Sequence, residues 1–161
     1  MSTTPPSPFT SVFNAQATLA ECPVWAADVQ ALYWVDILAP SLNRFDPATG
    51  QNSVMTLPEH IGCFGRRQSG GFIAGLRSGI WLLDTQGQPT ECVARPVKDT
   101  TVSRFNDGRV DPWGNFWAGT IHEPRPQPAA QLFRVSKDLE CSAVAGGVDV
   151  SNGVAFSLDR R

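Results

Sequence analysis

Three oxygen-bearing side chains stand at the same position of a repeated pattern in this sequence. They are Glu21, Asn106 and Asn152, and each lies four positions before an apolar residue of a predicted innermost strand. Those apolar residues are Trp25, Val110 and Phe156. A carboxylate with two amide carbonyls suits a hard divalent cation such as Ca²⁺, Mg²⁺ or Mn²⁺, with water completing the coordination. The set therefore predicts a cation site with neither His nor Cys among these three ligands.

A repeat of short strands must bring these residues together. Aromatic and β-branched runs alternate with Gly, Asp and Pro turns, and no helical periodicity persists for three turns, so strands dominate. Corresponding strands end at Trp34, Ala74 and Ala118, which are 40 and 44 positions apart. A period of about 40 to 50 residues indicates a β-propeller, in which the innermost strands line a central channel. A β-sandwich is the competing fold, but it predicts no fixed repeat.

The length fits an incomplete propeller. At about 45 residues per blade, the 161 residues supply about three and a half blades. We expect residues 1–12 to form a flexible tail, because they are rich in Ser, Thr and Pro. Residues 13–161 are expected to form a partial propeller whose C-terminal blades are absent. Open blade edges of this kind favour self-association.

Two of the candidate ligands have a simpler explanation as turn residues. Asn-Asp-Gly at 106–108 and Ser-Asn-Gly at 151–153 are turn signals in any protein. Their common register with Glu21, which lies among apolar residues at the start of a strand, favours the cation site. In the second repeat, His60 stands either at the equivalent position or in a loop, and the sequence leaves both open.

Composition excludes several classes of protein. With 13 Lys and Arg against 15 Asp and Glu, the net charge of -2 offers no footprint for nucleic acid or anionic lipid. No apolar run approaches the roughly 18 residues that span a bilayer. The four cysteines form no CxxC pair, which indicates free thiols rather than a zinc or redox site. We expect a cytoplasmic protein.

At these residues the sequence resembles the gluconolactonase and senescence-marker-protein (regucalcin) family of six-bladed propellers. The resemblance covers about residues 17–161 and rests on four stretches. They are LAECPVW at 19–25, ALYWVDI at 31–37, RFNDGRVDP at 104–112 with FWAGT at 116–120, and SNGVAFS at 151–157.

The resemblance implies roles for several residues. Glu21 and Asn152 are similar to direct ligands of one divalent metal (Ca, Zn, Mn or Mg), and Asn106 to a residue at the metal that also contacts substrate. Arg104 resembles an arginine that binds substrate oxygens, and Glu123 lies near where some relatives carry a substrate-contacting acid. The family's acidic general base is expected beyond Arg161, so no catalytic residue is assigned in this chain.

The implied activity is metal-dependent hydrolysis of a sugar lactone to the aldonic acid, weak or absent in a truncated chain. No GxSxG motif or Ser-His-Asp set suggests a covalent mechanism. Two alternatives remain open. One is a related propeller hydrolase that acts on phosphoesters or other esters, and the other is a non-catalytic propeller that binds calcium or a protein partner.

Overall fold

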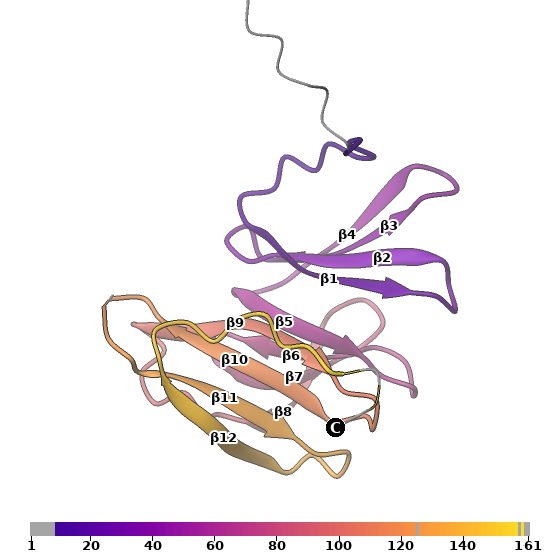
Figure 1. The fold of residues 1–161 in the computed structure, drawn as a ribbon. Helices are drawn as coiled ribbons and strands as arrows, with labels where there is room; N and C mark the ends of the chain where they lie inside the picture. Colours follow the sequence, from indigo (N-terminus) through magenta and orange to yellow (C-terminus); the bar gives the residue numbers. More distant parts are fainter. Residues whose placement is uncertain (1–8, 125, 158, 160–161) are drawn as a thin grey trace, which may run out of the picture.

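The computed structural model describes residues 9–124, 126–157 and 159. They form twelve strands in three four-stranded antiparallel sheets, each built from four consecutive strands (Figure 1). The first sheet contains β1 (Ala20–Ala26), β2 (Ala31–Asp36), β3 (Ser41–Asp46) and β4 (Gln51–Thr56). The second contains β5 (Ile61–Arg66), β6 (Phe72–Leu76), β7 (Gly79–Leu83) and β8 (Pro89–Ala94). The third contains β9 (Ser103–Val110), β10 (Phe116–His122), β11 (Ala130–Val135) and β12 (Cys141–Val148).

The sheet is the repeating unit that the spacing predicts. Trp34, Ala74 and Ala118 lie in β2, β6 and β10, which are the second strands of their sheets. No helix occurs in the described ranges, so the predicted all-β class is confirmed there. One period of the sequence therefore corresponds to one antiparallel sheet.

The turn between β9 and β10 shows how the local sequence fixes a hairpin. The carboxylate of Asp111 accepts hydrogen bonds from the backbone N–H groups of Trp113 and Asn115 at 2.9 and 2.8 Å. Its second oxygen accepts from the Asn115 side chain at 2.7 Å and from Trp117 Nε1 at 2.9 Å. Gly114 has a φ of 88°, in the left-handed region that glycine adopts without a steric penalty. Residues 111–114 therefore form one of the Gly, Asp and Pro turns that the sequence predicts between strands.

The first strands of the three sheets meet at the centre of the structure. β9 packs along β5, and β1 contacts both of them. Gly62 in β5 faces the backbone of Phe105 and Asn106 so closely that a Cβ atom there would overlap it. The side chains of Phe64, Phe105 and Phe116 are fully buried in this core. Of the outermost strands, β4 and β12 are largely exposed and β8 is mostly half-buried, so the core lies toward the inner strands.

The two ends of the described chain lie outside the sheets. Residues 1–8 of the expected tail fall outside the described residues, while residues 9–12 are exposed and form no strand. Phe13 stacks on Phe45 with ring centroids 5.5 Å apart. After β12, Val150 forms an isolated bridge with Ile121. Residues 151–157 form no strand, so the innermost strand predicted at Phe156 is not formed. This last segment lies beside β9 and β10 (Figure 1).

All four cysteines are free, as their spacing predicts. Burial raises the pKa of the Cys22 thiol to about 11 and that of Cys63 well above its ordinary value. Thiols with such pKa values are almost wholly protonated at neutral pH, and we infer that both act as small apolar core residues.

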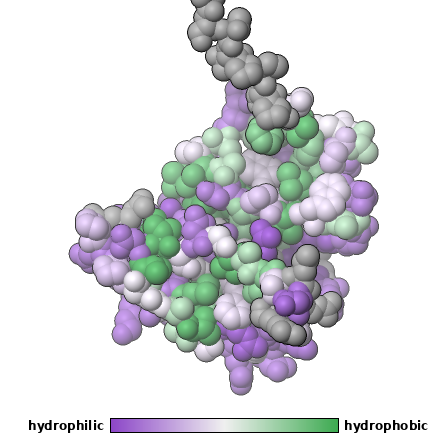
Figure 2. All heavy atoms as spheres, viewed as in Figure 1, coloured by the Kyte–Doolittle hydropathy of each residue, from purple (hydrophilic) through white to green (hydrophobic). Residues whose placement is uncertain are grey.

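Within the described residues, no helix is long and apolar enough to cross a bilayer. On the face shown in Figure 2, hydrophobic patches alternate with hydrophilic ones and no single apolar surface dominates.

Candidate metal and substrate site

A β-bulge interrupts each first strand near the same end. In β1 the pairing with β2 shifts between Glu21 and Val24, and in β5 the pairing with β6 shifts between Ile61 and Cys63. In β9 the shift leaves Asn106 without a register partner on β10. A bulge turns side chains out of the regular alternation and is common beside binding sites. Glu21 and Asn106 therefore lie where the strands depart from the regular pleat.

The backbone after Glu21 matches the backbone after Asn152. Cys22 has a φ of 51° and Gly153 a φ of 71°, both in the left-handed region. The value at Cys22 is unusual because a residue with a side chain adopts this region only rarely, whereas glycine adopts it freely. Asp107, which follows Asn106, is not in this region.

Hydrogen bonds bring the segment that carries Asn152 against β9. The Asn106 side chain donates from Nδ2 to the Ser151 carbonyl at 3.4 Å. The Asp107 carboxylate accepts from the backbone N–H of Gly153 at 2.6 Å and of Val154 at 3.3 Å. The side chains of Asn106 and Asp107 thus anchor residues 151–154.

Glu21 lies on β1 with its side chain exposed. The thiol of the next residue, Cys22, donates to the Gly108 carbonyl of β9 at 3.3 Å, which joins the first and third sheets. Within the described residues, the Glu21 carboxylate forms neither a hydrogen bond nor an ion pair. Its oxygens are therefore free to bind a ligand.

Arg104 on β9 is the most buried of the candidate residues, with 7% of its surface exposed. Its Nε donates to Glu123 Oε1 at 3.1 Å, and its Nη1 donates to the Phe105 carbonyl at 3.1 Å and to Asn106 Oδ1 at 3.3 Å. The guanidinium is thus fixed by three hydrogen bonds, while the two N–H donors of Nη2 have no acceptor among the described residues.

Glu123, which follows β10, binds two arginines at once. Its Oε1 accepts from Arg104, and its Oε2 accepts from Arg77 at 2.8 Å. Burial acts to raise the pKa of Glu123, but the hydrogen bond and charge of Arg77, followed by those of Arg104, outweigh it and lower the pKa below its ordinary value. The carboxylate is therefore ionised at neutral pH, with both oxygens engaged by protein groups.

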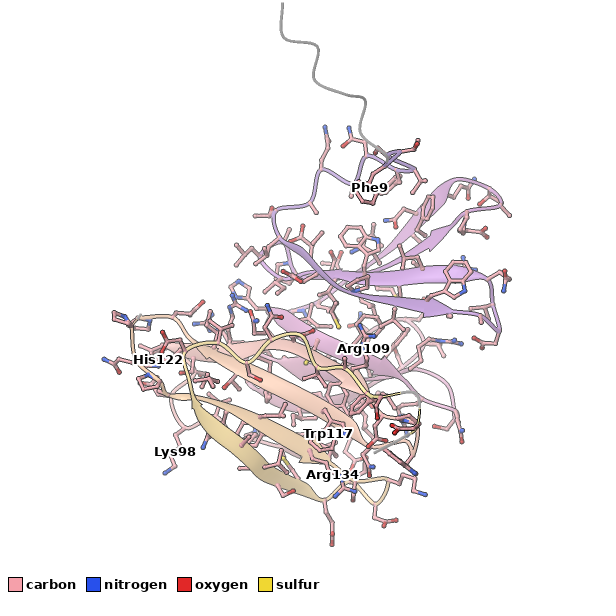
Figure 3. The ribbon with its side chains drawn as sticks, viewed as in Figure 1. Phe9, Lys98, Arg109, Trp117, His122 and Arg134 are labelled. Carbon is pink, nitrogen blue, oxygen red and sulfur yellow. The ribbon has the colours of Figure 1, made fainter. Side chains whose placement is uncertain are left out.

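These residues lie at one end of the third sheet. Ser103 on β9 pairs with His122 on β10, and Arg104 and Glu123 are their immediate neighbours. Figure 3 shows His122 at this end, while Trp117 and Arg134 lie toward the other. The candidate site is thus separate from the 111–114 turn, which closes the opposite end of the β9–β10 hairpin.

The three candidate ligands offer the atom type that a hard cation prefers, but their total negative charge is smaller than the charge of a dication. Glu21, Asn106 and Asn152 offer only oxygen, which suits such an ion. Together they carry a single negative charge, and the amide oxygens of Asn106 and Asn152 accept from Arg104 and from the Gly153 N–H, at 3.3 and 3.0 Å. No group of three His, Cys, Asp or Glu able to hold a metal occurs within the described ranges.

The second repeat contributes no side chain at the corresponding bulge. Gly62 occupies that position in β5, while His60 precedes the strand. The Nδ1 of His60 lies 3.2 Å from Nη1 of Arg77, and because arginine can only donate, Nδ1 accepts. Of the two sequence-based placements of His60, the structure therefore favours the loop.

Arg77 was not singled out from the sequence. It lies in the tight turn between β6 and β7, and nothing in its local sequence distinguishes it from a solvated turn arginine. Its contacts come from segments 17 to 46 positions away, which local sequence does not reveal.

The chain is similar in sequence to known proteins. The family model described as SMP-30/Gluconolactonase/LRE-like region matches residues 19–161. A 6-deoxy-6-sulfogluconolactonase of Pseudomonas putida is 54% identical over 149 residues, which cover 92% of this chain and 51% of that protein. Regucalcin of Xenopus laevis is 34% identical over 148 residues, covering 89% and 50%. The chain thus spans about half the length of these curated relatives.

A solved structure shows the same arrangement of sheets. It is regucalcin of Agrobacterium tumefaciens strain C58, described as a calcium-binding protein. It superposes with a TM-score of 0.81 at 26% identity, over 89% of this chain and 48% of that one.

Consecutive four-stranded sheets that meet through their first strands define a protein of the β-propeller class. Within that class, the chain belongs to the SMP-30/gluconolactonase/LRE-like family.

Proposed function

We propose that this chain carries part of the active site of a metal-dependent sugar lactone hydrolase, which converts an aldonolactone to the aldonic acid. The observation that carries the proposal is Arg104, a buried guanidinium with free Nη2 donors, held beside Asn106 at the bulge of β9. The three sheets would be three blades of a ring that the family resemblance puts at six.

Lactone hydrolysis places clear demands on such a site. The oxygen of water adds to the carbonyl carbon, the ring C–O bond breaks, and a proton passes to the departing ring oxygen. Negative charge develops on the carbonyl oxygen in the tetrahedral intermediate, so donors fixed beforehand stabilise the transition state. In our proposal Arg104 and Asn106 bind and orient the polyol, because their side chains already hold one another in place.

A divalent cation is the second element of the proposal. It would be held by Glu21, Asn152 and Asn106, and when bound it would supply Lewis acidity toward the lactone carbonyl. The general base is not assigned to any residue of this chain. One carboxylate leaves a dication undercompensated, so we expect a further acidic group to complete the site.

The substrate class follows from the relatives. The Pseudomonas putida relative is named for a lactone with a sulfonate in place of the 6-hydroxyl. We propose that this chain acts on six-carbon aldonolactones and that the sulfonated lactone is the preferred one. A sulfonate is a fixed anion that suits arginine donors, and the Arg77–Glu123–Arg104 group carries a net positive charge.

The test is lactone opening followed by proton release in a weakly buffered solution. Substrates are D-glucono-1,5-lactone and its 6-deoxy-6-sulfo analogue, each with and without EDTA. Two proteins are compared: the chain alone, and an extended protein in which the chain is joined to the part of the Pseudomonas putida relative that it does not match. We expect chelator-sensitive hydrolysis by the extended protein and much less by the chain alone.

Variants at the site and a matched surface variant show whether turnover depends on the candidate ligands. Glu21→Gln and Asn152→Ala should abolish metal-dependent turnover, whereas Asp138→Asn, an exposed substitution in the β11–β12 turn, should not change it. Activity that persists in EDTA would exclude the metal, and absence of hydrolysis with either lactone would exclude the enzyme assignment.

A second candidate function is calcium binding without catalysis. It is favoured by the oxygen-only ligand set and by the relative described as a calcium-binding protein. Isothermal titration with Ca²⁺ combined with the lactone assay distinguishes the two functions. Both predict Ca²⁺ uptake through Glu21 and Asn152, but a protein that only binds calcium would open no lactone.

A further inference from the structure

Arg77 links three segments of the chain that approach one another only in the folded structure. Its Nε donates to the Thr100 carbonyl at 2.7 Å, and its Nη2 donates to the Thr101 carbonyl at 3.1 Å and to Glu123 Oε2 at 2.8 Å. Its Nη1 donates to His60 Nδ1. Every nitrogen of the guanidinium therefore has a protein partner, so the orientation of Arg77 is fixed by the protein.

The turn that carries Arg77 is held firmly. The backbone N–H of Arg77 donates to the His60 carbonyl at 2.8 Å. The next residue, Ser78, donates from its backbone N–H and its hydroxyl to the two oxygens of Glu59, at 2.7 and 2.6 Å. A long side chain fixed at both its backbone and its tip works as a rigid brace between the second and third sheets.

The far end of this brace is Glu123. The side chain of Glu123 is 35% exposed, so it would turn into solvent if no group held it. Its Oε2 is held by Arg77, and this leaves Oε1 aimed at Nε of Arg104. With Nε and Nη1 fixed, the planar guanidinium of Arg104 has only one orientation for its Nη2 donors.

We propose that Arg77 is a positioning residue for substrate binding: through Glu123 it fixes the orientation of Arg104, so that the free donors of Arg104 meet the lactone. This inference rests on the proposed function and deepens it. It also gives Glu123 the task of orienting Arg104, in place of the substrate contact that the resemblance implies.

The size of the effect follows from the bonds involved. Arg77 and Glu123 are partly exposed, so their ion pair contributes little by itself. The larger effect is that Arg104 is no longer oriented to donate one charge-assisted hydrogen bond to the substrate. Loss of that bond corresponds to about a tenfold change in affinity. Arg77→Met should therefore raise KM about tenfold and leave kcat within about twofold, because binding that is equal in ground and transition states changes KM alone. Arg77→Lys keeps the charge but not the planar set of N–H donors, so its KM should lie between that of the unaltered protein and that of Arg77→Met.

A double-mutant cycle tests the route through Glu123. Kinetics are measured on the extended protein with Arg77→Met, Glu123→Gln and the double variant. If Arg77 acts only through Glu123, the double variant should have the KM of Glu123→Gln alone. Additive effects would overturn the proposal, as would an unchanged KM in Arg77→Met.

A second readout does not require activity. In the full chain, the Nε–Hε resonance of Arg104, assigned with an Arg104→Lys variant, should move or broaden in Arg77→Met. The control is Arg67→Met. Arg67 follows the C-terminal end of β5, whereas Arg77 contacts His60 at the N-terminal end, so the control removes an equal charge and should leave the Arg104 resonance unchanged.

The two readouts keep the failures apart. If no lactone is hydrolysed but the Arg104 resonance changes in Arg77→Met, the proposed function is wrong while the structural effect of Arg77 on Arg104 is supported. If hydrolysis is observed and the resonance of Arg104 ignores Arg77, the positioning role is wrong.

Discussion

The Asp107 carboxylate holds the segment that carries Asn152, and its removal should release that segment. Asp107 accepts from the N–H groups of Gly153 and Val154 at 2.6 and 3.3 Å. Other attachments of this segment include the 3.4 Å bond from Asn106 to the Ser151 carbonyl, the 2.9 Å bond from Ser151 N–H to the Thr120 carbonyl, and the ring contact of Trp117 with Phe156 at 6.0 Å.

The magnitude can be worked from the shorter of the two bonds. A hydrogen bond to a charged group contributes about 1.5 to 3 kcal/mol. Gly153 is exposed, so water replaces the lost acceptor and the lower end of that range applies. Asp107→Ala should therefore increase the open population of residues 151–154 by about tenfold, since about 1.4 kcal/mol corresponds to a factor of ten.

Amide hydrogen exchange is the direct assay. The Gly153 and Val154 amides should exchange about tenfold faster in Asp107→Ala, provided that exchange follows local opening. If Asn152 binds the cation from the closed segment, the dissociation constant for Ca²⁺ or Mn²⁺ should rise by up to the same factor. Asp138→Ala is the control, because it removes an exposed carboxylate from a distant turn.

Two results would refute this reasoning. Unchanged exchange at Gly153 would show that the Asp107 bonds do not hold the segment. Weaker cation binding with unchanged exchange would show instead that Asp107 is itself a ligand.

Three further outcomes are expected. Asp111→Asn should lower stability by about 3 kcal/mol, or about 6 to 12 °C in Tm, because an amide cannot accept all four hydrogen bonds. Burial acts to raise the pKa of Asp111, but hydrogen bonds from Trp117 and Asn115 outweigh it and hold the pKa below its ordinary value. Its contribution is thus present above about pH 4 and is lost as the pH falls through the lowered pKa, so urea titrations of Asp111→Asn should show less loss in acid than the parent chain. Gly62→Ala should cost about 3 kcal/mol in urea denaturation by forcing β5 from β9, whereas Gly146→Ala, whose added carbon meets neighbours at 3.4 Å or more, should cost little. At pH 8 a thiol with a pKa of about 11 is ionised to about one part in a thousand, so Cys22 should resist a disulfide reagent until the chain unfolds, and labelling of Cys22 in the native chain would contradict the burial.

The sequence predicted the repeat because each sheet places similar side chains at similar positions. Aromatic and aliphatic residues of the second strands, such as Trp34 and Ala74, recur because each must pack between neighbouring strands. The sequence did not identify β4, β5, β8 and β12; of these, β5 and β12 contain glycines and small residues, as in IGCFGR and CSAVAGGV. Such residues have low strand propensity, and Gly62 is there because the backbone of β9 leaves no room for a Cβ atom.

The sequence predicts only those candidate site residues that occupy equivalent positions in the repeat. Glu21, Asn106 and Asn152 share a position in the repeat, so their types could be compared without a structure. Asn106 begins the sequence Asn-Asp-Gly, which is typical of turns, yet it lies inside β9. Pairing of β9 with β10 outweighs this local preference. The ion pairs of Glu123 depend on Arg77, a side chain from a different sheet, and no local pattern encodes that contact.

Charge balance relates the arginine pair to the proposed cation. Arg77 and Arg104 share one carboxylate, Glu123, so this group carries a net charge of about +1. Glu21 and Asp107, which holds the Asn152 segment, each add one negative charge, so the whole set carries about -1. A dication added to this set leaves an excess of about one positive charge. That excess suits the oxyanion of a lactone intermediate and a sulfonate, but it weakens retention of the metal when no anion is bound. Cation and anionic ligand should therefore bind cooperatively: 6-deoxy-6-sulfogluconate should lower the dissociation constant for Mn²⁺, and by linkage Mn²⁺ should lower that of the sulfonate by the same factor.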